Sequence, residues 1–167
     1  MNTLEFRELS LTNLDEIIDL RVRPVQSDLV ADNLYSIAQA GLDPSGKCRA
    51  VYMDNRPVGF FFLRECERGT LVYICRFMVD QLWQGRGIGR RIMTQLVDVL
   101  FSSPQVEVVD LAVSKGPGGA EEFYRKCGFV PTGEPYRGGW RMLLRRSDYC
   151  PHTHAEPDAG ANRFVIL

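Results

Sequence analysis

The stretch W-Q-G-R-G-I-G-R-R at residues 83–91 places three glycines at alternate positions among three arginines, just after an apolar run. A glycine-rich turn between a strand and a helix leaves backbone N–H groups free to point outward. The positive end of the helix dipole lies behind them, and together these groups favour phosphate. The stretch therefore predicts an anion site, and the spacing of the glycines bears on which anion.

Two common phosphate-binding patterns do not fit this loop. The nucleoside triphosphate loop G-x-x-x-x-G-K-[ST] needs a Lys-Ser or Lys-Thr pair, which is missing here. The dinucleotide fingerprint G-x-G-x-x-G, counted from Gly85 and Gly87, meets Arg90 in place of its third glycine. A third pattern, Q/R-x-x-G-x-G/A, is matched by Gln84, Gly87 and Gly89. A tight turn with solvated arginines is the alternative that the loop alone leaves open.

A second motif lies downstream. Residues 123–129 read F-Y-R-K-C-G-F, an aromatic-Tyr pair on a short predicted helix followed by Gly-Phe. One helix and one strand are predicted between this motif and the glycine loop. With both motifs in this order, the sequence resembles the GCN5-related N-acetyltransferases over roughly residues 3–145. The resemblance implies acetyl-CoA as co-substrate, no metal, and direct transfer of acetyl to a primary amine in a ternary complex.

The resemblance also implies where the cofactor binds. The central strand would line the thioester arm with Phe77, Met78 and Val79. Tyr124 matches the family tyrosine that acts as general acid near the CoA sulfur, with packing beneath the cofactor as the alternative role. The loop residues that would wrap the pyrophosphate, mainly through backbone amides, are Gln84, Gly85, Arg86, Gly87, Ile88, Gly89 and Arg90.

The sequence departs from the family pattern at two places. Pro117 stands where many relatives carry an asparagine that contacts pantetheine. Cys75 and Arg76 stand where polyamine-acetylating relatives place an acid on the central strand. The general base is therefore unassigned, and an amine partly deprotonated in solution needs none. The candidate bases are Glu65, Glu67, Asp110 and Glu134.

The acceptor is read from residues 21–40, which resemble those of bacterial diamine or polyamine acetyltransferases of this superfamily. Asp28 and Tyr35 are candidates for binding a cationic amine, because a carboxylate pairs with ammonium and an aromatic face attracts a cation. Asp32, Asn33 and Asp43 are further candidates, although acids are also typical of a helix N-terminus. We expect a diamine or polyamine. The alternatives are another amine (an antibiotic, an amino acid or a protein N-terminus) and a non-catalytic acyl-CoA sensor.

Hydrophobic periodicity and turn residues predict the elements that position these side chains. Helices are predicted over residues 14–22, 28–40, 92–101 and 120–127, and strands over 5–9, 49–53, 58–63, 71–79, 106–113, 129–132 and 140–144. The strand, loop, helix and strand of residues 71–113 form a βαβ-type unit. The fold class is α/β. By the resemblance it is a single-domain mixed, mostly antiparallel sheet with a splayed parallel strand pair and helices on both faces.

Composition limits the partners. The 167 residues contain 20 Lys and Arg against 21 Asp and Glu, so no global field recruits nucleic acid or an anionic membrane. No apolar stretch is long enough to span a bilayer, and the N-terminus lacks a signal-peptide pattern, so we expect a cytoplasmic protein. By analogy with the family we expect a homodimer.

The domain is predicted to cover residues 1–146, with a polar tail over 147–167. The tail contains Cys150, His152 and His154, which are too few and too loosely placed to predict a metal site. Its apolar end at residues 164–167 could dock on the domain or on a second subunit.

Overall fold

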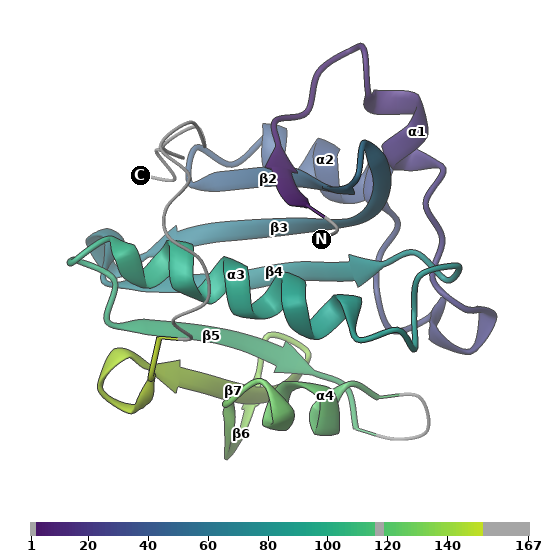
Figure 1. The fold of residues 1–167 in the computed structure, drawn as a ribbon. Coiled ribbons are helices and arrows are strands. Elements are labelled where there is room, and N and C mark those ends of the chain that lie inside the picture. Colours follow the sequence, from purple (N-terminus) through teal and green to yellow (C-terminus); the bar gives the residue numbers. More distant parts are fainter. Residues whose placement is uncertain (1–2, 116–118, 152–167) are drawn as a thin grey trace.

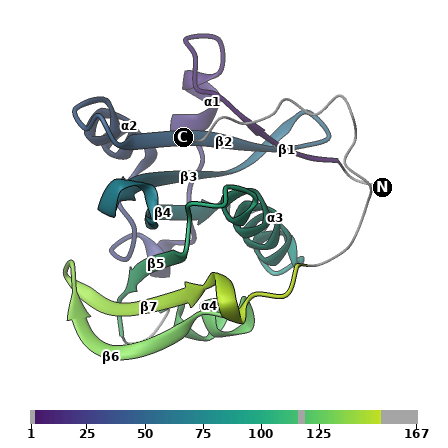
Figure 2. The same cartoon turned by 90° about the vertical axis from the view of Figure 1, so that its left-hand side faces the viewer.

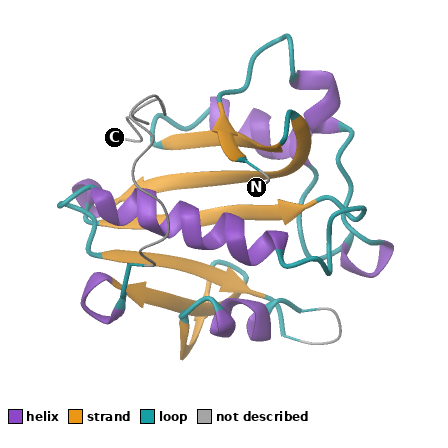
Figure 3. Cartoon of the chain, in the orientation of Figure 1, coloured by secondary structure: helices purple, strands orange, loops and turns teal. Residues whose placement is uncertain are grey.

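The computed structural model describes residues 3–115 and 119–151. Within these ranges, strands form one seven-stranded sheet in the order β1-β2-β3-β4-β5-β7-β6 (Figures 1 and 3). Neighbouring strands are antiparallel except for β4 and β5, which are parallel. The predicted mixed, mostly antiparallel sheet is thus confirmed.

The described parts of the chain form seven strands, four α-helices and three single 3-10 turns. The strands are β1 (Leu4–Arg7), β2 (Gly46–Met53), β3 (Arg56–Cys66), β4 (Leu71–Val79), β5 (Val108–Val113), β6 (Val130–Tyr136) and β7 (Gly139–Arg145). The α-helices are α1 (Leu14–Ile18), α2 (Asn33–Gly41), α3 (Ile88–Ser102) and α4 (Glu121–Lys126). Single 3-10 turns are η1 (Pro24–Gln26), η2 (Glu67–Gly69) and η3 (Arg146–Asp148). None of the described helices is both long and apolar enough to cross a membrane.

Two apolar cores lie on opposite faces of the sheet. Helices α3 and α4 pack on one face, and α1 and α2 pack on the other (Figure 2). Alternate side chains of a strand point to opposite faces, so three consecutive phenylalanines of β3 divide between the cores. Phe61 joins the α3 core, whereas Phe60 and Phe62 join the α1 and α2 core. The predicted helices on both faces are therefore present.

The parallel pair is splayed. Strands β4 and β5 pair only from Leu71 opposite Val108 to Ile74 opposite Leu111. In the ladder with β3, Phe62 faces Arg76 and Leu63 faces Ile74, so Cys75 is an extra residue and forms a bulge. Beyond it, no described strand pairs with the β5-facing edge of residues 75–79. The diverging ends open a space between β4 and β5.

The first predicted helix is shorter than its apolar spacing indicates. Helix α1 ends at Ile18 instead of reaching residue 22. The chain after it pairs with the end of β4, because Arg21 N donates to Asp80 Oδ2 at 2.9 Å and Gln81 N donates to Arg21 O at 2.7 Å. These tertiary hydrogen bonds replace another turn of helix.

The second predicted helix starts later than predicted. Helix α2 begins at Asn33 and not at residue 28. Asp32 has extended backbone, and its carboxylate accepts a hydrogen bond from Tyr35 N at 2.7 Å, which caps the helix. Residues 27–32 therefore remain a loop that faces the sheet.

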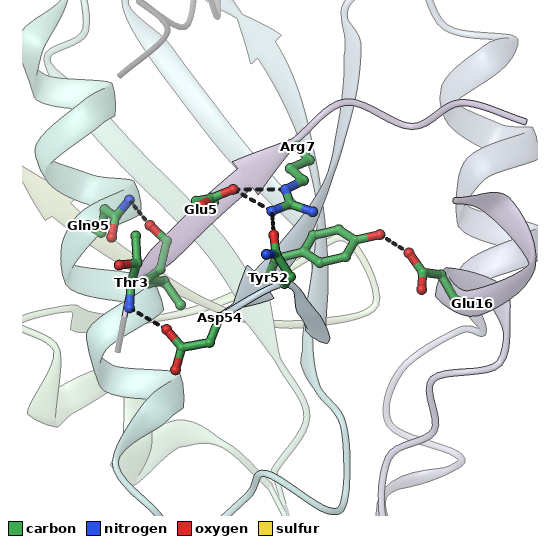
Figure 4. A network of polar contacts seen from close by, with 9 residues as sticks. Thr3, Glu5, Arg7, Glu16, Tyr52, Asp54 and Gln95 are labelled. Carbon is green, nitrogen blue, oxygen red and sulfur yellow. Dashed lines mark hydrogen bonds and ion pairs between the residues drawn. The ribbon is translucent and has the colours of Figure 1, made fainter. Parts of the chain in front are cut away.

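A polar network fixes α1 and the edge strand β1 against the sheet (Figure 4). The Tyr52 hydroxyl donates to the Glu16 carboxylate of α1, and the Arg7 guanidinium lies 4.1 Å above the Tyr52 ring. Gln95 Nε2 of α3 donates to Leu4 O at 3.3 Å. Both faces of the sheet are thereby tied to its first strand.

Contacts with the domain continue past β7. The Arg146 guanidinium donates to Phe101 O at 2.6 Å and Val106 O at 2.6 Å, carbonyls at and beyond the end of α3. The Tyr149 hydroxyl donates to Asp98 Oδ1 of α3 at 2.6 Å. The predicted polar tail at residues 147–167 lies mostly outside the described residues, and its boundary stays a prediction.

Candidate active site

The glycine loop between β4 and α3 needs its glycines for two different reasons. Gly85 and Gly87 have φ of 79° and 76°, a left-handed conformation that side chains with a Cβ rarely adopt. At Gly89 an added Cβ would lie 3.3 Å from Phe123 Cε2 and 3.5 Å from a Val79 methyl. The first two glycines shape the turn, and the third lets α3 approach β4 and α4 closely.

The loop ends at the N-terminus of a long helix. The first bond that closes the helix runs from Arg91 N to Gly87 O, so the N–H groups of Ile88, Gly89 and Arg90 form the unpaired first turn. No acidic side chain lies in that turn. The Ile88 side chain is buried in the core, so only its backbone faces the loop. This arrangement suits an anion such as a diphosphate.

The loop forms one wall of a cleft of about 740 Å³. The cleft follows the splay between β4 and β5 and extends to α4, to residues 22–31 and to the turn between β6 and β7. Ten residues expected at the site line it: Asp28, Phe77, Met78, Val79, Gln84, Gly85, Gly87, Gly89, Arg90 and, at the α4 wall, Tyr124. The fold thus brings most of the residues predicted to bind the cofactor together in one cleft.

Two loop residues, Arg86 and Gln84, use their side chains for contacts within the protein. The Arg86 guanidinium lies 5.5 Å from the centre of the Trp83 ring and does not line the cleft. Gln84 Nε2 donates to Val79 O at 2.8 Å, so its amide closes the end of β4. Their contribution to an anion site would come from the backbone.

Tyr124 is a buried phenol at the α4 wall. Its ring packs edge-on against Phe123 at 5.0 Å and Phe129 at 5.8 Å, and Phe123 stacks on Phe77 of β4 at 5.8 Å. Burial raises the pKa of Tyr124 above its ordinary value, with smaller contributions from the nearby Cys127 and Tyr73. The protein therefore keeps this hydroxyl protonated, as an acid requires.

The carboxylates proposed as a base lie elsewhere. Asp110 is fully buried and forms an ion pair with Arg141 at 2.8 Å, although burial still raises its pKa. Glu65, Glu67 and Glu134 do not line the cleft. Among the described residues that line it, Asp28 is the one carboxylate.

The acceptor candidates separate in the structure. Asp28 lines the cleft, whereas Tyr35 is 58% exposed and lies outside it. Asn33 is buried and donates to Ile17 O at 2.7 Å. Asp43 accepts hydrogen bonds from Ser45 and pairs with Arg64, and these contacts, those from Ser45 most, lower its pKa. Asp32 caps α2, so these last three residues serve the fold.

Tyr73, Arg76 and Arg137 line the cleft but are not predicted from the sequence to bind a ligand, nor is Arg23, which lies beside the glycine loop. Tyr73 and Arg76 come from β4, and Arg137 from the turn after β6. Arg23 lies beside the glycine loop, since a Cβ added to Gly85 would be 3.7 Å from Arg23 Nη2. Each belongs to a segment without a motif. The sheet order brings Tyr73, Arg76 and Arg137 together, and the hydrogen bonds between Arg21 and residues 80–81 bring the segment of Arg23 to the loop. Their one sequence signal is an arginine or tyrosine next to a turn or on the central strand.

Other sequence predictions fall on undescribed residues. Pro117, His152, His154 and residues 164–167 lie outside the described ranges. Within the described ranges, no group of three His, Cys, Asp or Glu side chains is placed to hold a metal ion.

Comparison with known proteins agrees with this geometry. Residues 14–129 match the model of the acetyltransferase (GNAT) family, a match that includes both motifs. The chain therefore belongs to the GNAT acetyltransferase family, and it is an N-acetyltransferase that uses acetyl-CoA.

Several relatives cover almost the whole chain at low identity. The spermine/spermidine N(1)-acetyltransferase of Bacillus subtilis (strain 168) is 21% identical, with 86% of this chain and 98% of the relative covered. The aminoglycoside acetyltransferase AAC(6')-Ib in complex with coenzyme A has a TM-score of 0.73 at 16% identity, covering 87% of this chain and 96% of that one. For spermidine N-acetyltransferase from Vibrio cholerae in complex with CoA and spermine, the values are 0.67, 19%, 87% and 96%. The solved structures support the fold.

Proposed function

We propose that this protein transfers acetyl from acetyl-CoA directly to the primary amine of a small acceptor in a ternary complex. The observation that carries the proposal is the single cleft that joins the glycine loop, the open edge of β4 and the buried Tyr124 hydroxyl. The helix N-terminus and loop amides suit the diphosphate. The unpaired edge of residues 75–79 offers backbone groups for the pantetheine amides.

The reaction follows from these positions. The neutral amine attacks the thioester carbonyl, and the tetrahedral intermediate expels the CoA thiolate as the C–S bond breaks. Tyr124 supplies the proton that the thiolate takes, and solvent restores it. The amine's own surplus proton leaves to water or through Asp28, the carboxylate in the cleft. Because the attacking nitrogen must be neutral, the rate should rise as the acceptor deprotonates.

A diamine or polyamine acceptor was expected from the sequence. Two observations support it: the printed activity of the Bacillus subtilis relative and the carboxylate of Asp28 in the cleft. The aminoglycoside acetyltransferase has a similar fold, so a larger amine is an alternative acceptor. The cationic side chains of the same cleft, Arg76 and Arg137, favour an acceptor that also carries a negative charge.

The test is release of CoA thiol by purified protein with acetyl-CoA and a panel of amines: spermidine, spermine, putrescine, an aminoglycoside, free amino acids and a peptide N-terminus. We expect release with at least one member, and the acetylated product by mass spectrometry. CoA binding without turnover across the panel would favour an acyl-CoA sensor instead.

A further inference from the structure

The half of the cleft away from the glycine loop carries more positive than negative charge. We call this half, lined by Val22, Gln26, residues 28–31, Tyr73, Cys75, Arg76 and Arg137, the acceptor half. Its charged lining residues are Asp28, Arg76 and Arg137. A polycation would meet two guanidiniums here, and like charges in a cleft oppose binding.

Arg76 has hydrogen-bonding capacity that the protein does not use. Its Nη1 donates to Cys75 O at 2.7 Å, and its Nη2 reaches Gln39 Oε1 at only 3.4 Å. Its Nε is buried and donates to no described residue. A buried N–H of a cation without an acceptor is costly, so this guanidinium favours an anionic partner.

Arg137 is held at the cleft by aromatic rings. Its guanidinium carbon lies 4.4 Å above the Tyr73 ring and 5.2 Å from the Tyr136 ring. Arg137 and Gly138 have φ of 47° and 83°, which makes the tight turn between β6 and β7. Figure 2 shows this turn curving toward the face of the sheet that α1 and α2 occupy. A guanidinium stacked by its plane keeps its N–H edge available for a carboxylate.

Two other arginines of the same sheet, in contrast, are paired with carboxylates. Arg64 pairs with Asp43, and Arg141 pairs with the buried Asp110. Neither Arg76 nor Arg137 forms an ion pair with any residue in the described parts of the chain. The two arginines that line the acceptor half thus have no ion-pair partner in the described parts of the chain, which leaves their charge for a ligand.

We infer that Arg76 and Arg137 form a carboxylate subsite, and that the acceptor is an amine that also bears a carboxylate, such as an amino acid. This inference rests on the proposed function and narrows it. The carboxylate would be bound by the two guanidiniums, while the amine reaches the thioester near Tyr124. Arginine forks suit a carboxylate because they can donate two parallel hydrogen bonds.

Matched acceptors test the inference. Lysine and cadaverine, ornithine and putrescine, and alanine and ethylamine differ within each pair only by a carboxylate. We expect kcat/KM for CoA release to favour the carboxylate-bearing member of at least one pair by about tenfold or more, the range of a charged hydrogen bond. In Arg76→Gln and Arg137→Gln this preference should fall to near unity. Arg56→Gln, an exposed arginine outside the cleft, should keep it.

Product binding separates this inference from the proposed function. The affinities of Nε-acetyl-lysine and N-acetylcadaverine for the protein saturated with CoA are measured by calorimetry. Tighter binding of the carboxylate-bearing product that Arg76→Gln abolishes supports the subsite, even for a protein that turns neither amine over. Equal binding, or acetylation of the diamines at least as fast as of the amino acids, overturns the subsite. Acetylation of diamines alone would still leave the proposed transferase activity standing.

Discussion

At the residue scale, the surroundings of Tyr124, the candidate general acid, determine its protonation. Tyr124 is packed among Phe123, Phe129 and the cofactor cleft, and burial raises its pKa above the ordinary range. A raised pKa means that the protonated form persists at neutral and mildly alkaline pH and is lost only as the pH rises through that higher value. The hydroxyl is therefore available to a departing thiolate whenever the amine is neutral enough to react.

Substituting Tyr124→Phe removes this proton and keeps the aromatic packing. We expect kcat to fall by about 100-fold, a typical contribution of general acid catalysis, with CoA affinity unchanged. Steady-state kinetics and calorimetry measure the two quantities. Tyr149→Phe is the matched control, because the Tyr149 hydroxyl donates a hydrogen bond to Asp98 and lies away from the cleft. A proportional loss of CoA affinity would assign Tyr124 to packing alone.

The pH profile tests the same residue. Because the pKa of Tyr124 is raised, kcat/KM should rise with pH as the acceptor amine deprotonates and then level, with no fall up to about pH 10, the ordinary value for tyrosine. Thiol release in buffers of constant ionic strength gives the profile. A descending limb that Tyr124→Phe removes, centred well below that pH, would contradict the raised pKa.

At the element scale, the sequence predicts best where one element decides its own bounds. Strand β4 was predicted residue for residue, because its apolar, β-favouring run is bounded by polar and loop residues on both sides. The predictions of α1 and α2 are too long. Arg21 N donates to the distant Asp80 carboxylate and the Asp32 side chain caps α2, and apolar spacing reports neither a tertiary contact nor a side-chain cap. The glycine loop is identified by spacing, whereas the cleft residues Arg76 and Arg137 come together only through sheet order.

The left-handed loop residue Gly87 gives a prediction for this element. In Gly87→Ala, the backbone keeps φ near 76° at a cost of roughly 1–2 kcal/mol, or it relaxes and moves the first amides of α3. We expect a loss of unfolding free energy of that size and weaker CoA binding. Gly41→Ala is the control, since Gly41 is helical and an added Cβ meets nothing within 4 Å. Denaturant melts and CoA titration check both, and an unchanged CoA affinity in Gly87→Ala would contradict the assignment of the loop to the cofactor.

The segment after α1 reaches the same loop. Since Arg23 Nη2 lies beside Gly85, we expect Arg23→Ala to weaken CoA binding by about tenfold through loss of a charged hydrogen bond to a phosphate. The effect should shrink as salt is raised. Arg21→Ala is the matched control, because the Arg21 guanidinium turns back to donate to Leu20 O at 3.0 Å. Equal losses in both variants would indicate a general effect of charge.

At the scale of the whole molecule, the sheet separates two cores and places the functional groups at its splayed centre. The first core holds α3 and α4 behind the glycine loop, and the second holds α1 and α2 on the acceptor side. Strands β6 and β7 extend the sheet past the cleft and bring Arg137 back to it. The expected homodimer and cytoplasmic location stay predictions. For the dimer, light scattering of the purified chain is the direct measurement.

The buried pair between Asp110 of β5 and Arg141 of β7 fixes this extension of the sheet. Arg141 Nε and Nη2 both reach Asp110 Oδ2, at 2.9 and 2.8 Å, and the carboxylate is 0% exposed. Breaking such a pair leaves an uncompensated buried charge, so Arg141→Met should cost on the order of 3 kcal/mol of unfolding free energy at neutral pH.

The sign of the pH dependence follows from the carboxylate that remains. In Arg141→Met the folded pKa of Asp110 rises further above its unfolded value, because burial already raises it and the opposing guanidinium is gone. The folded variant then holds this proton more tightly than the folded wild type, whereas the unfolded chains titrate alike. The stability lost relative to wild type therefore grows as pH rises above the wild-type folded pKa of Asp110, which burial already raises. Urea melts at about pH 4 and pH 7.5 should show a smaller loss at the lower pH. Asp110→Leu combined with Arg141→Met should recover much of the loss, because the buried charge is gone; an equal loss at both pH values without that recovery would mean that Arg141 stabilises the sheet by packing over Tyr136.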